Sequence, residues 1–341
     1  MSRLGAAALA TLATAAALLL ASCADAGVYE ATPVPGQQTS ATSTTPSGTA
    51  TTTPAPAPTN PDVTVANCLQ SYAPPPQLPP PGQMPAGSTM ARIQARGRLI
   101  AGVSADTLLL GSRDPVSGQI EGFDIDMLHA VSQAIFNNPN KIELRVITTA
   151  QRLPVLKAGS VDIVARNMTI TCDRWKEIAF SSEYYRSGQK VMVHLGDTAQ
   201  GGGPITGMAD LVGKKVCAPN ASTSMTKLRT FAGVIPVGAD THTGCLVLFQ
   251  EGKVDAITGD DTVLAGLAVQ DPYALVVKAP AFTAEPYGLG FNAANVDFVA
   301  FVNGVLAQVR ADGQWTKSYN TWLSALGKAP TPPVAVYGRT R

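Results

Sequence analysis

Charge is scarce in this sequence of 341 residues: 14% are charged, and the 25 basic residues nearly balance the 24 acidic ones. No basic run interrupts it, so nothing supports binding to nucleic acid or another polyanion. The three histidines lie far apart and no two of the five cysteines have CxxC spacing, which argues against a metal site. The glycine-rich run GGGP has no nucleotide-binding context, and no catalytic set stands in motif form, so no cofactor is expected.

The most apolar stretch lies at the N-terminus. Residues 1–22 hold one arginine, no acid and an apolar run that ends in small residues before Cys23. This pattern is typical of a secretory signal. A transmembrane anchor is the alternative, because the run is nearly long enough to span a bilayer, but no basic stop signal follows. The Leu-Ala-Ser-Cys end resembles a bacterial lipobox, which implies that acylated Cys23 anchors the chain in the lipid bilayer, on the extracytoplasmic face of the cell membrane.

Two segments are rich in proline. From residue 31 to 87 the composition changes to Pro, Thr, Ser, Ala and Gln, with few apolar side chains and no period, so no core is expected there. Prolines favour an extended, semi-rigid chain. We therefore assign residues 23–89 to a lipid anchor and tether, and residues 326–341 to a C-terminal tail.

Four cysteines remain if Cys23 carries lipid, and an even number in an exported chain favours two disulfides with three possible connectivities. We favour Cys217 with Cys245, because they are close in sequence. In the chain-entropy model, closing such a loop contributes about 3 to 4 kcal/mol. Cys68 with Cys172 would then pin the end of the tether onto the folded domain.

The folded part begins near residue 90, where short apolar runs alternate with segments of helical period. This alternation predicts an α/β fold with parallel sheet. Strands are expected at RLIAGVS, KIELRVI, SVDIVAR, KVMVHLG, KKVCAP, GVIPVG and KVDAITG. Helices are expected at GFDIDMLHAVSQAIF, RLPVLKAG, NASTSMTKLRTFA, TGCLVLFQEG, DDTVLAGLAVQ, VDFVAFVNGVLAQVRADG and GQWTKSYNTWL. Another helix should start after Thr171, which suits an N-cap, with Arg174 in its first turn.

The second half of this region partly repeats the first. GSVDIVARNMT and GKVDAITGDDT each carry an apolar strand into a polar turn. Ligands of open α/β sheets bind outside the carboxyl ends of the strands. Two similar lobes with facing strand ends would therefore form a cleft.

Five segments then occur in a characteristic order: GFDIDMLHAV, LKAGSVDIVARNMTITCDRWKEIAFSSEYY, DLVGKKVCAPNASTS, GKVDAITGDDTVL and VNGVLAQVRADGQWTKSYNTWL. Over roughly residues 92–325 they resemble extracellular solute-binding proteins of the polar amino-acid type, the two-lobed receptors of ABC importers. The lipobox, the tether and the segments RDPVSGQIEGFDID and MTITCDR are most similar to actinobacterial glutamine/glutamate-binding lipoproteins.

The resemblance implies a type II periplasmic-binding-protein fold. Lobe 1 would comprise residues 90–193 and 286–325, and lobe 2 residues 194–285. The chain would cross between the lobes near residues 193–196 and again near residues 281–286.

A free amino acid carries a carboxylate and an ammonium, and burying both requires a cation with donors for one and an acid for the other. Arg174 offers a planar fork for the carboxylate near a helix start; an exposed helical charge is the alternative. The resemblance implies that Thr169 adds a hydroxyl. It also implies that Asn167, where a glycine is common, offers a carbonyl.

Across the cleft, the resemblance assigns the backbone N–H groups of Ser222, Thr223 and Ser224 to the same carboxylate. Asp260 matches the acid for the ammonium. Its neighbour Asp261 is the alternative, a charge satisfied locally at a helix start.

Two further arginines are candidates for reading the side chain of the ligand. Arg113 lies in SADTLLLGSRDP, and Arg166 precedes the polar turn at a strand end. A second cleft arginine would suit a side-chain carboxylate and favour glutamate or aspartate over glutamine or asparagine. Each arginine also has an ordinary surface interpretation.

Together these features predict a membrane-anchored, monomeric receptor that captures a polar amino acid by hinge closure and presents it to an ABC permease. A membrane sensor protein is the alternative partner, with the same ligand chemistry. A secreted enzyme on the same fold is a further alternative. It would need a cleft acid that is not tied to the ammonium of the ligand, such as Glu183 or Asp261.

Overall fold

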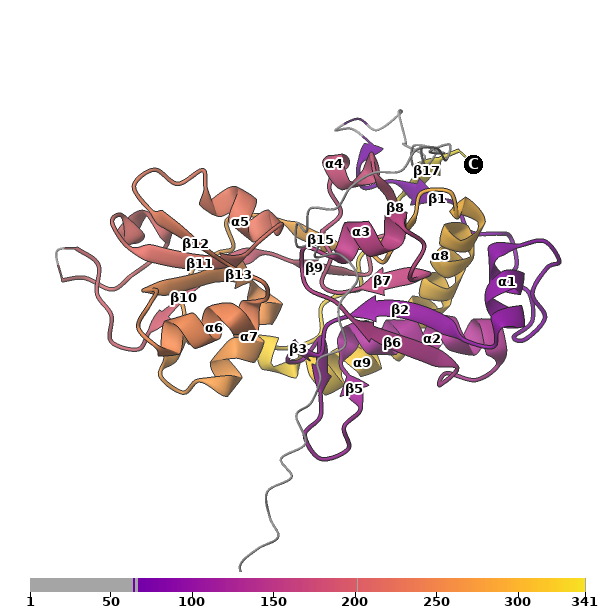
Figure 1. Cartoon of the computed structure of the whole chain (residues 1–341), viewed down its shortest axis with the longest axis horizontal. Helices are drawn as coiled ribbons and strands as arrows, with labels where there is room; N and C mark the ends of the chain where they lie inside the picture. The colour runs from indigo at the N-terminus through magenta and orange to yellow at the C-terminus, as the bar shows by residue number, and fades with distance from the viewer. Residues whose placement is uncertain (1–63, 65–66, 201, 341) are drawn as a thin grey trace, which may run out of the picture. The chain divides into compact units, whose positions relative to one another are not determined.

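The computed structural model describes residues 64, 67–200 and 202–340. The expectations for the signal segment 1–22, for acylated Cys23 and for most of the tether lie outside the described residues. Among those that are described, none of the helices combines the length and apolar character that a membrane-spanning helix needs. Two five-stranded sheets, each flanked by helices, form the two lobes (Figure 1).

The first lobe is built on a sheet with the strand order β6-β2-β7-β16-β8. Its strands are β2 (Leu99–Val103), β6 (Ile142–Val146), β7 (Ile163–Ala165), β8 (Ile178–Phe180) and β16 (Gly290–Asn292). The helices that share its apolar core are α1 (Thr89–Arg96), α2 (Phe123–Phe136), α3 (Arg152–Lys157), α4 (Cys172–Trp175), α8 (Val296–Ala311) and α9 (Gln314–Trp322). The short helix η3 (Ser324–Leu326) follows α9. Strand β2 runs parallel to β6 and β7.

The second lobe is built on a sheet with the strand order β12-β11-β13-β10-β14. Its strands are β10 (Gln189–His194), β11 (Lys215–Pro219), β12 (Ile235–Ala239), β13 (Ala256–Asp260) and β14 (Ala274–Val276). Its helices are α5 (Thr223–Leu228), α6 (His242–Gln250), α7 (Asp261–Gln270) and the short η2 (Met208–Leu211). Figure 1 shows α5 on one face of the sheet and α6 with α7 on the other. Two separate apolar clusters fill these faces, because successive strand residues such as Val216 and Cys217 point to opposite sides.

Both sheets are mixed, which corrects the expectation of parallel sheet. In the first, β16 runs antiparallel to β7 and β8. In the second, β10 runs antiparallel to β13 and β14. Both exceptions are strands that follow a crossing between the lobes, so each enters its sheet from the opposite direction.

Two antiparallel strands join the lobes: β9 (Tyr185–Ser187) and β15 (Glu285–Tyr287). Strand β15 lies at the end of the segment where the sequence placed the return crossing. The outward crossing predicted near residues 193–196 is wrong, because β10 already pairs with β13 from Gln189 onwards. The apolar run KVMVHL predicts a strand but carries no sign of which sheet receives it.

The two ends of the described chain pack on the first lobe. Strands β1 (Ser71–Tyr72) and β17 (Tyr337–Arg339) pair in parallel beside β8 (Figure 1). The Ser71 hydroxyl donates to the Phe180 carbonyl at 2.8 Å, and the Asn303 amide donates to the Tyr72 carbonyl at 2.7 Å. We call residues 67–72 with residues 337–339 the terminal clamp. The predicted tether and tail are therefore wrong at these positions, since isolated apolar side chains in proline-rich sequence give no periodic signal.

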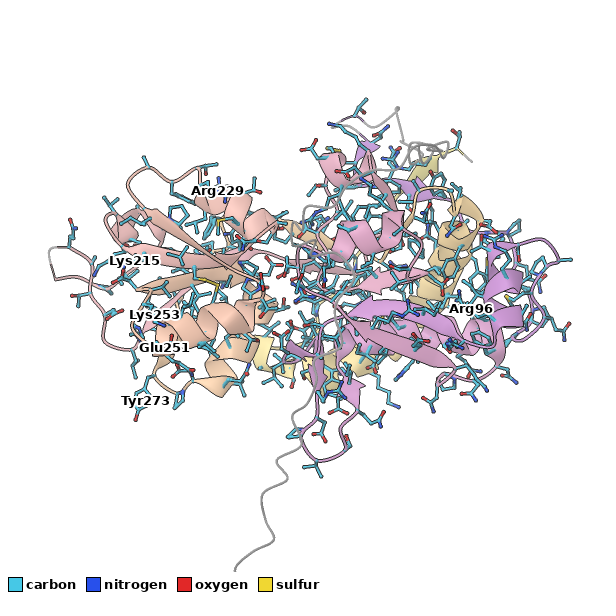
Figure 2. All side chains as sticks on the ribbon, viewed as in Figure 1. Arg96, Lys215, Arg229, Glu251, Lys253 and Tyr273 are labelled. Atoms are coloured by element: carbon cyan, nitrogen blue, oxygen red, sulfur yellow. A yellow bond between two sulfur atoms is a disulfide. The ribbon has the colours of Figure 1, made fainter. Side chains whose placement is uncertain are left out.

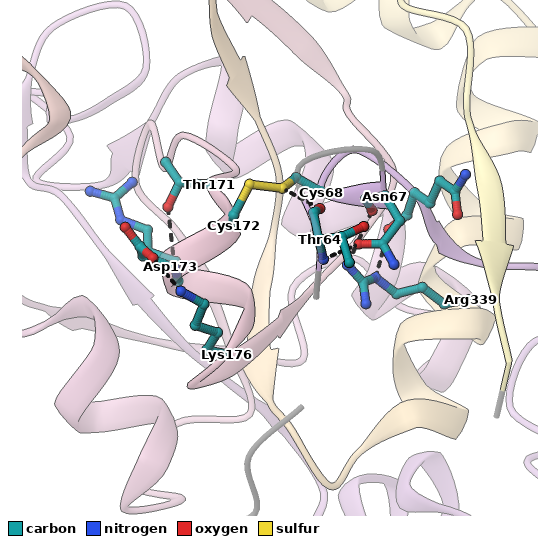
Figure 3. Close-up of a disulfide and its surroundings, with 10 residues drawn as sticks. Thr64, Asn67, Cys68, Thr171, Cys172, Asp173, Lys176 and Arg339 are labelled. Atoms are coloured by element: carbon teal, nitrogen blue, oxygen red, sulfur yellow. Dashed lines mark hydrogen bonds and ion pairs between the residues drawn. A yellow bond between two sulfur atoms is a disulfide. The ribbon is translucent and has the colours of Figure 1, made fainter. Parts of the chain in front are cut away.

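Both predicted disulfides are confirmed. Cys217 of β11 and Cys245 of α6 are buried on the face of the second sheet that α6 covers. Cys68 of the terminal clamp bonds to Cys172, the first residue of α4 (Figure 3). The Arg339 guanidinium lies 3.8 Å from the centre of the Trp175 ring, and Tyr72 meets that ring edge-on. Helix α4 is thus held by both ends of the described chain.

The strands and helices predicted from periodicity are confirmed. Helix α1, strands β8, β14 and β16 and the crossing strands have no counterpart among the predicted elements. Residues 106–121, for which no strand was predicted, form a small antiparallel sheet of β3 (Asp106–Thr107), β4 (Gly111–Arg113) and β5 (Ile120–Glu121). These strands are two or three residues long, too short for a period to show.

Candidate functional site

Arg174 is buried at the start of α4. Thr171 caps this helix as predicted, its hydroxyl accepting from the Arg174 backbone N–H at 3.2 Å. The guanidinium donates to the Thr169 carbonyl at 2.7 Å and to the Ala221 carbonyl, in the second lobe, at 3.3 Å. Burial lowers the pKa of Arg174, and the carboxylates of Glu285 and Asp260 oppose that shift. With only 8% of its surface exposed, Arg174 is not the solvated helical charge that was the alternative.

Three exposed basic residues of the second lobe differ from the buried Arg174. Lys215, Arg229 and Lys253 point outward from the second sheet and its helices (Figure 2). Ordinary surface charges of this kind cost little, whereas a buried guanidinium has to be compensated by acids and carbonyls. Arg174 has acids and carbonyls around it, so its surroundings are a candidate for binding a polar ligand.

Thr169 and Thr223 meet at Glu285. Both hydroxyls donate to the same Glu285 carboxylate oxygen, at 2.7 and 2.8 Å, and they lie 3.3 Å apart. Thr169 belongs to the first lobe, Thr223 begins α5 in the second, and Glu285 stands on the crossing strand β15. Glu285 was not predicted from the sequence, because nothing in TAEPYG distinguishes it from a surface acid. We call Thr169, Arg174, Thr223, Asp260 and Glu285 the anchor cluster.

Asp260 is one of the two acids of the cluster and lies at the end of β13. One carboxylate oxygen accepts from the Tyr287 hydroxyl at 2.6 Å, while the other, Oδ1, is buried without a hydrogen-bond partner among the described residues. Burial, together with the nearby Glu285 carboxylate, raises the pKa of Asp260 to about 7. Asp261 instead accepts from the Ser187 hydroxyl and is partly exposed. Of the two neighbours, Asp260 is the one suited to receive a cation.

Arg152 is a second buried guanidinium that the sequence analysis missed. Its Nη1 donates to the carbonyls of Arg166 and Asn167, each at 3.3 Å, and its Nη2 faces the Ala221 carbonyl at 3.5 Å. The Ala221 carbonyl therefore faces both Arg152 and Arg174. Arg152 is the first residue of α3, a position at a helix start like that of Arg174, so the same signal could have pointed to it.

Asn167 occupies a left-handed backbone conformation, with φ of +37°. Asparagine tolerates this region better than most residues, and glycine best. Its backbone N–H donates to the buried Asp124 carboxylate at 2.8 Å, while its carbonyl accepts from Arg152. Burial raises the pKa of Asp124 to about 6. The carbonyl that was expected to face a ligand is thus engaged by Arg152, whereas the side-chain Oδ1 is buried without a partner in the described chain.

The three residues at the start of α5 differ in what they contact. Ser222 is the N-cap: its hydroxyl accepts from the Met225 N–H at 2.9 Å and donates to the Pro219 carbonyl at 2.7 Å. Thr223 reaches Glu285 and the first lobe. The buried Ser224 accepts through its carbonyl from the Gln189 amide at 3.1 Å. The structure therefore brings Thr223 to the anchor cluster and uses the Ser222 side chain as a cap.

The two arginines proposed for the ligand side chain have different positions. Arg113 is exposed on β4 and donates to the Gly118 carbonyl at 2.6 Å, so it belongs to the β4–β5 hairpin and not to the anchor cluster. Arg166 is buried; it donates to the Ile147 carbonyl and to the Thr149 hydroxyl, both at 2.8 Å. The backbone carbonyl of Arg166 accepts from the Arg152 guanidinium, and Arg152 and Arg174 both face the Ala221 carbonyl.

The acids named for an enzymatic alternative are engaged elsewhere. The Glu183 carboxylate is paired with Arg186 through hydrogen bonds of 2.6 and 2.5 Å. Asp261 is bonded to Ser187. Within the described part of the chain, no group of three or more His, Cys, Asp or Glu side chains is placed to hold a metal ion.

The anchor cluster draws on both lobes and on the crossing strand between them. It offers buried cationic donors and hydroxyls on one side and an acid with an unpartnered oxygen on the other. This combination suits a small molecule that carries an anionic and a cationic group close together.

The chain is similar in sequence to known solute-binding proteins. Residues 99–325 match the model of the bacterial extracellular solute-binding proteins, family 3. The ABC transporter glutamine-binding protein GlnH of Bacillus subtilis (strain 168) is 31% identical over 237 residues, which cover 69% of this chain and 84% of that protein. The glutamine-binding protein of Geobacillus stearothermophilus is 36% identical over 205 residues, 60% of this chain and 76% of that protein.

More distant relatives and solved structures agree with this grouping. The glutamate-binding protein GluB of Corynebacterium efficiens is 27% identical over 248 residues, 69% of this chain and 82% of that protein. The structure of an ancestral arginine-binding protein bound to glutamine is similar, with a TM-score of 0.61 and 30% identity over 67% of this chain and 98% of the other. These likenesses confirm the predicted two-lobed α/β fold.

Proposed function

This chain belongs to family 3 of the bacterial extracellular solute-binding proteins, and on that premise we propose that it is a receptor for a polar amino acid. It would act as a monomer, capture the ligand by hinge closure and present it to an ABC permease. Acylated Cys23 would hold it at the extracytoplasmic face of the cell membrane. Glutamate and aspartate are the favoured ligands, with glutamine and asparagine as weaker ones.

The observation that carries the proposal is the pairing of Arg174 with Asp260 in one buried cluster. Arg174 would bind the α-carboxylate, supported by the hydroxyl of Thr169. The unpartnered Oδ1 of Asp260 would accept from the α-ammonium. A buried acceptor without a partner costs about 1 to 3 kcal/mol, so a ligand ammonium at this oxygen would relieve a cost that the protein otherwise bears.

The charge next to the cluster supports a preference for acidic ligands. Arg152 and Arg166 are both buried beside the cluster; Asp260 is the acid whose charge opposes that of Arg152, and Asp106 and Asp124 are the acids that oppose that of Arg166. A guanidinium that faces the ligand would offer charged donors to an anionic side chain. Arg113 is exposed on the β4–β5 hairpin and is not part of this charged group. The names of the relatives, which include glutamine-binding and glutamate-binding proteins, fit the same group of ligands.

Hinge closure is supported by the contacts that span the lobes. Arg174 of the first lobe faces the Ala221 carbonyl of the second, and Thr169 faces Thr223. The crossing strands β9 and β15 are the covalent connections between the lobes. A ligand that contacts groups of both lobes stabilises the arrangement in which those groups are close together, and so shifts the population toward it.

Thermal unfolding of the full chain against each common free amino acid tests the proposal. A ligand at 100 times its dissociation constant adds about 2.7 kcal/mol to the free energy of unfolding, which is an easily measured shift. We expect glutamate or aspartate to give the largest shift. A protein whose unfolding temperature no amino acid changes would not be an amino-acid receptor.

A further inference from the structure

Helix α7 of the second lobe carries buried residues on two of its faces. Leu264 and Leu267 are three positions apart, so they lie on one stripe of the helix, and both belong to an apolar cluster of the second lobe. Val263 belongs instead to the apolar cluster of the first lobe. Gly266, three positions after Val263, lies on the same stripe and is also buried. This stripe of α7 therefore faces the first lobe.

The backbone of the first lobe lies directly against Gly266. A Cβ added to Gly266 would be 2.6 Å from the Leu108 carbonyl oxygen and 3.3 Å from the carbonyl carbon. Ordinary close contacts between carbon and oxygen are about 3.3 to 3.6 Å long, so the first of these distances is a clash. The obstacle is main chain, and no change of rotamer removes it. Glycine at this position is therefore what allows α7 to lie against β3 and the residues after it (Figure 1).

Residues 106–110, which we call the interlobe loop, are held firmly on the first lobe. The carbonyls of Leu109 and Leu110 accept from the first two backbone N–H groups of α2, both at 3.0 Å. Leu109 has a φ of +76°, in the left-handed region that leucine rarely adopts. Such a conformation persists only where the surrounding structure imposes it. The Leu108 carbonyl, next to Leu109, is thus part of a fixed surface.

A second helix of the second lobe contacts the same loop. The Thr243 hydroxyl of α6 donates to the Asp106 carbonyl at 2.8 Å. Helices α6 and α7 therefore each meet a main-chain carbonyl of the interlobe loop. Neither contact involves a residue of the anchor cluster, so the two lobes meet here independently of the groups assigned to the ligand.

We propose that the interlobe loop, Thr243 and Gly266 form a latch that stabilises the arrangement in which the lobes are close together, with Gly266 as the positioning residue that allows it to form. This inference rests on the proposed function, since it needs lobes that separate and close. The latch contacts main chain and not ligand. It therefore sets the affinity for every ligand by the same factor, through the population of the closed arrangement.

An added methyl group at Gly266 has opposite effects on binding and on stability. When the lobes are apart, the Leu108 carbonyl is no longer against α7, and alanine is a better helix former than glycine. When the lobes close, the same methyl group collides with the carbonyl. Binding should therefore weaken, whereas the stability of the protein without ligand should not fall. A residue that only packs inside its own lobe does not produce this combination.

The experiment compares the full-length wild type with Gly266→Ala by isothermal titration with L-glutamate and with L-glutamine. Because overpacking acts on the closed arrangement alone, we expect both affinities to be about five- to a hundredfold weaker, by the same factor for the two ligands. Stopped-flow kinetics should assign the loss mainly to faster dissociation, with the association rate within about threefold. Thermal unfolding without ligand should give an unchanged or higher midpoint.

Gly244→Ala is the matched control. Gly244 also lies in a helix of the second lobe, α6, but a Cβ there would be 3.4 Å from the Ala239 Cβ, an ordinary contact within one lobe. This variant should bind both amino acids as the wild type does. Thr243→Val tests the other half of the latch: it removes the hydroxyl that bonds to the Asp106 carbonyl and should weaken both ligands about two- to tenfold.

Three results would overturn the proposal. Normal affinity in Gly266→Ala would show that closure does not need the close approach to Leu108. A lower unfolding midpoint without ligand would show permanent packing between the lobes and not a latch. If Gly266→Ala does not fold, Thr243→Val decides, and its normal affinity would count against the latch. Failure of the proposed function has a separate signature: the wild type itself gives no binding signal with either amino acid, and the latch falls with it.

Discussion

The two short helices of the site, α4 in the first lobe and α5 in the second, begin alike and are held differently. Each starts at a hydroxyl N-cap, Thr171 or Ser222. Helix α4 is then bonded through Cys172 to the terminal clamp, and its Trp175 packs between Tyr72 and Arg339. Helix α5 rests on the apolar cluster beneath it through side chains such as Met225.

The difference indicates that the two lobes hold their helices at the site with unequal rigidity. The disulfide of the second lobe joins β11 to α6, on the face opposite α5, so it stabilises the lobe without fixing the helix at the site. We infer that the first lobe presents a preorganised anchor and that the second lobe supplies an adaptable closing surface. Preorganisation raises affinity by reducing the ordering that binding requires.

Removing the anchor itself should have the largest effect. Arg174→Ala deletes the buried guanidinium, and since hydrogen bonds to charged groups contribute about 1.5 to 3 kcal/mol each, we expect affinity to fall at least about a hundredfold. Isothermal titration measures this loss. Arg113→Ala, which removes an exposed guanidinium outside the cluster, is the control and should bind normally. Normal affinity in Arg174→Ala would refute the assignment of the site.

Asp260→Asn should come next, with affinity about 30-fold weaker because the ammonium loses its charged partner. In the wild type the ligand ammonium lowers the raised pKa of Asp260, so affinity for every amino acid should decrease as pH falls below about 7. Binding measured across this range checks the sign. Affinity that is constant from pH 8 to about pH 5.5 would show that Asp260 does not receive the ammonium.

The same substitution has a predicted effect on stability. The pKa of Asp260 in the folded chain is about 7, above the value of about 3.9 in an unfolded chain. The contribution of this group to the free energy of unfolding is therefore lost as pH rises from about 3.9 to about 7. Asp260→Asn should therefore raise the free energy of unfolding above pH 7 and change it little near pH 4. Denaturant unfolding at both pH values measures the difference.

The two disulfides provide the sharpest test of the comparison. Replacing Cys68 and Cys172 by serine should lower ligand affinity about three- to tenfold, because α4 loses a constraint next to Arg174. Replacing Cys217 and Cys245 should reduce thermal stability and leave affinity within about twofold. Isothermal titration measures the ligand affinity of both variants, and thermal unfolding measures their stability. Equal affinity losses in the two variants would remove the distinction between a clamped and an unclamped helix.

Thr223→Val should have the smallest effect. It removes one hydroxyl that bonds to Glu285, and a typical hydrogen bond contributes about 0.5 to 1.5 kcal/mol, so we expect a loss of about two- to tenfold. Because Thr223 contributes to closure, the change should appear mainly as faster ligand dissociation. Stopped-flow kinetics measures the rate. A loss as large as that of Arg174→Ala would place the anchor in the second lobe.

Local rules explain what the sequence could predict. The cap at Thr171 follows from a hydroxyl-rich turn within a few residues, whereas the choice of Arg174 as an anchor rested on the resemblance to a family. The pairing of Cys217 with Cys245 follows from short separation. These features depend on neighbours in the chain and were therefore accessible before the fold was known.

What the sequence could not predict depends on distant segments that meet. Glu285 receives hydroxyls from both lobes, and Arg152 faces the carbonyl of Ala221, which lies 69 positions later in the chain. The terminal clamp was hidden because its buried side chains are scattered among prolines. Arg113 was assigned to the ligand because a hairpin of two-residue and three-residue strands is indistinguishable from a cleft loop at the level of sequence.

The Cys68–Cys172 bond also determines where a mechanical load would enter the protein. A pull applied to the chain at Thr64 reaches Cys68 within a few residues and passes through the disulfide into α4 and the sheet of the first lobe. The crossing strands β9 and β15 lie outside this path and bear no tension. In a molecule held at acylated Cys23, as we propose, such a load would therefore leave the two strands that join the lobes free of tension, and the proposed movement of the second lobe would not have to work against it.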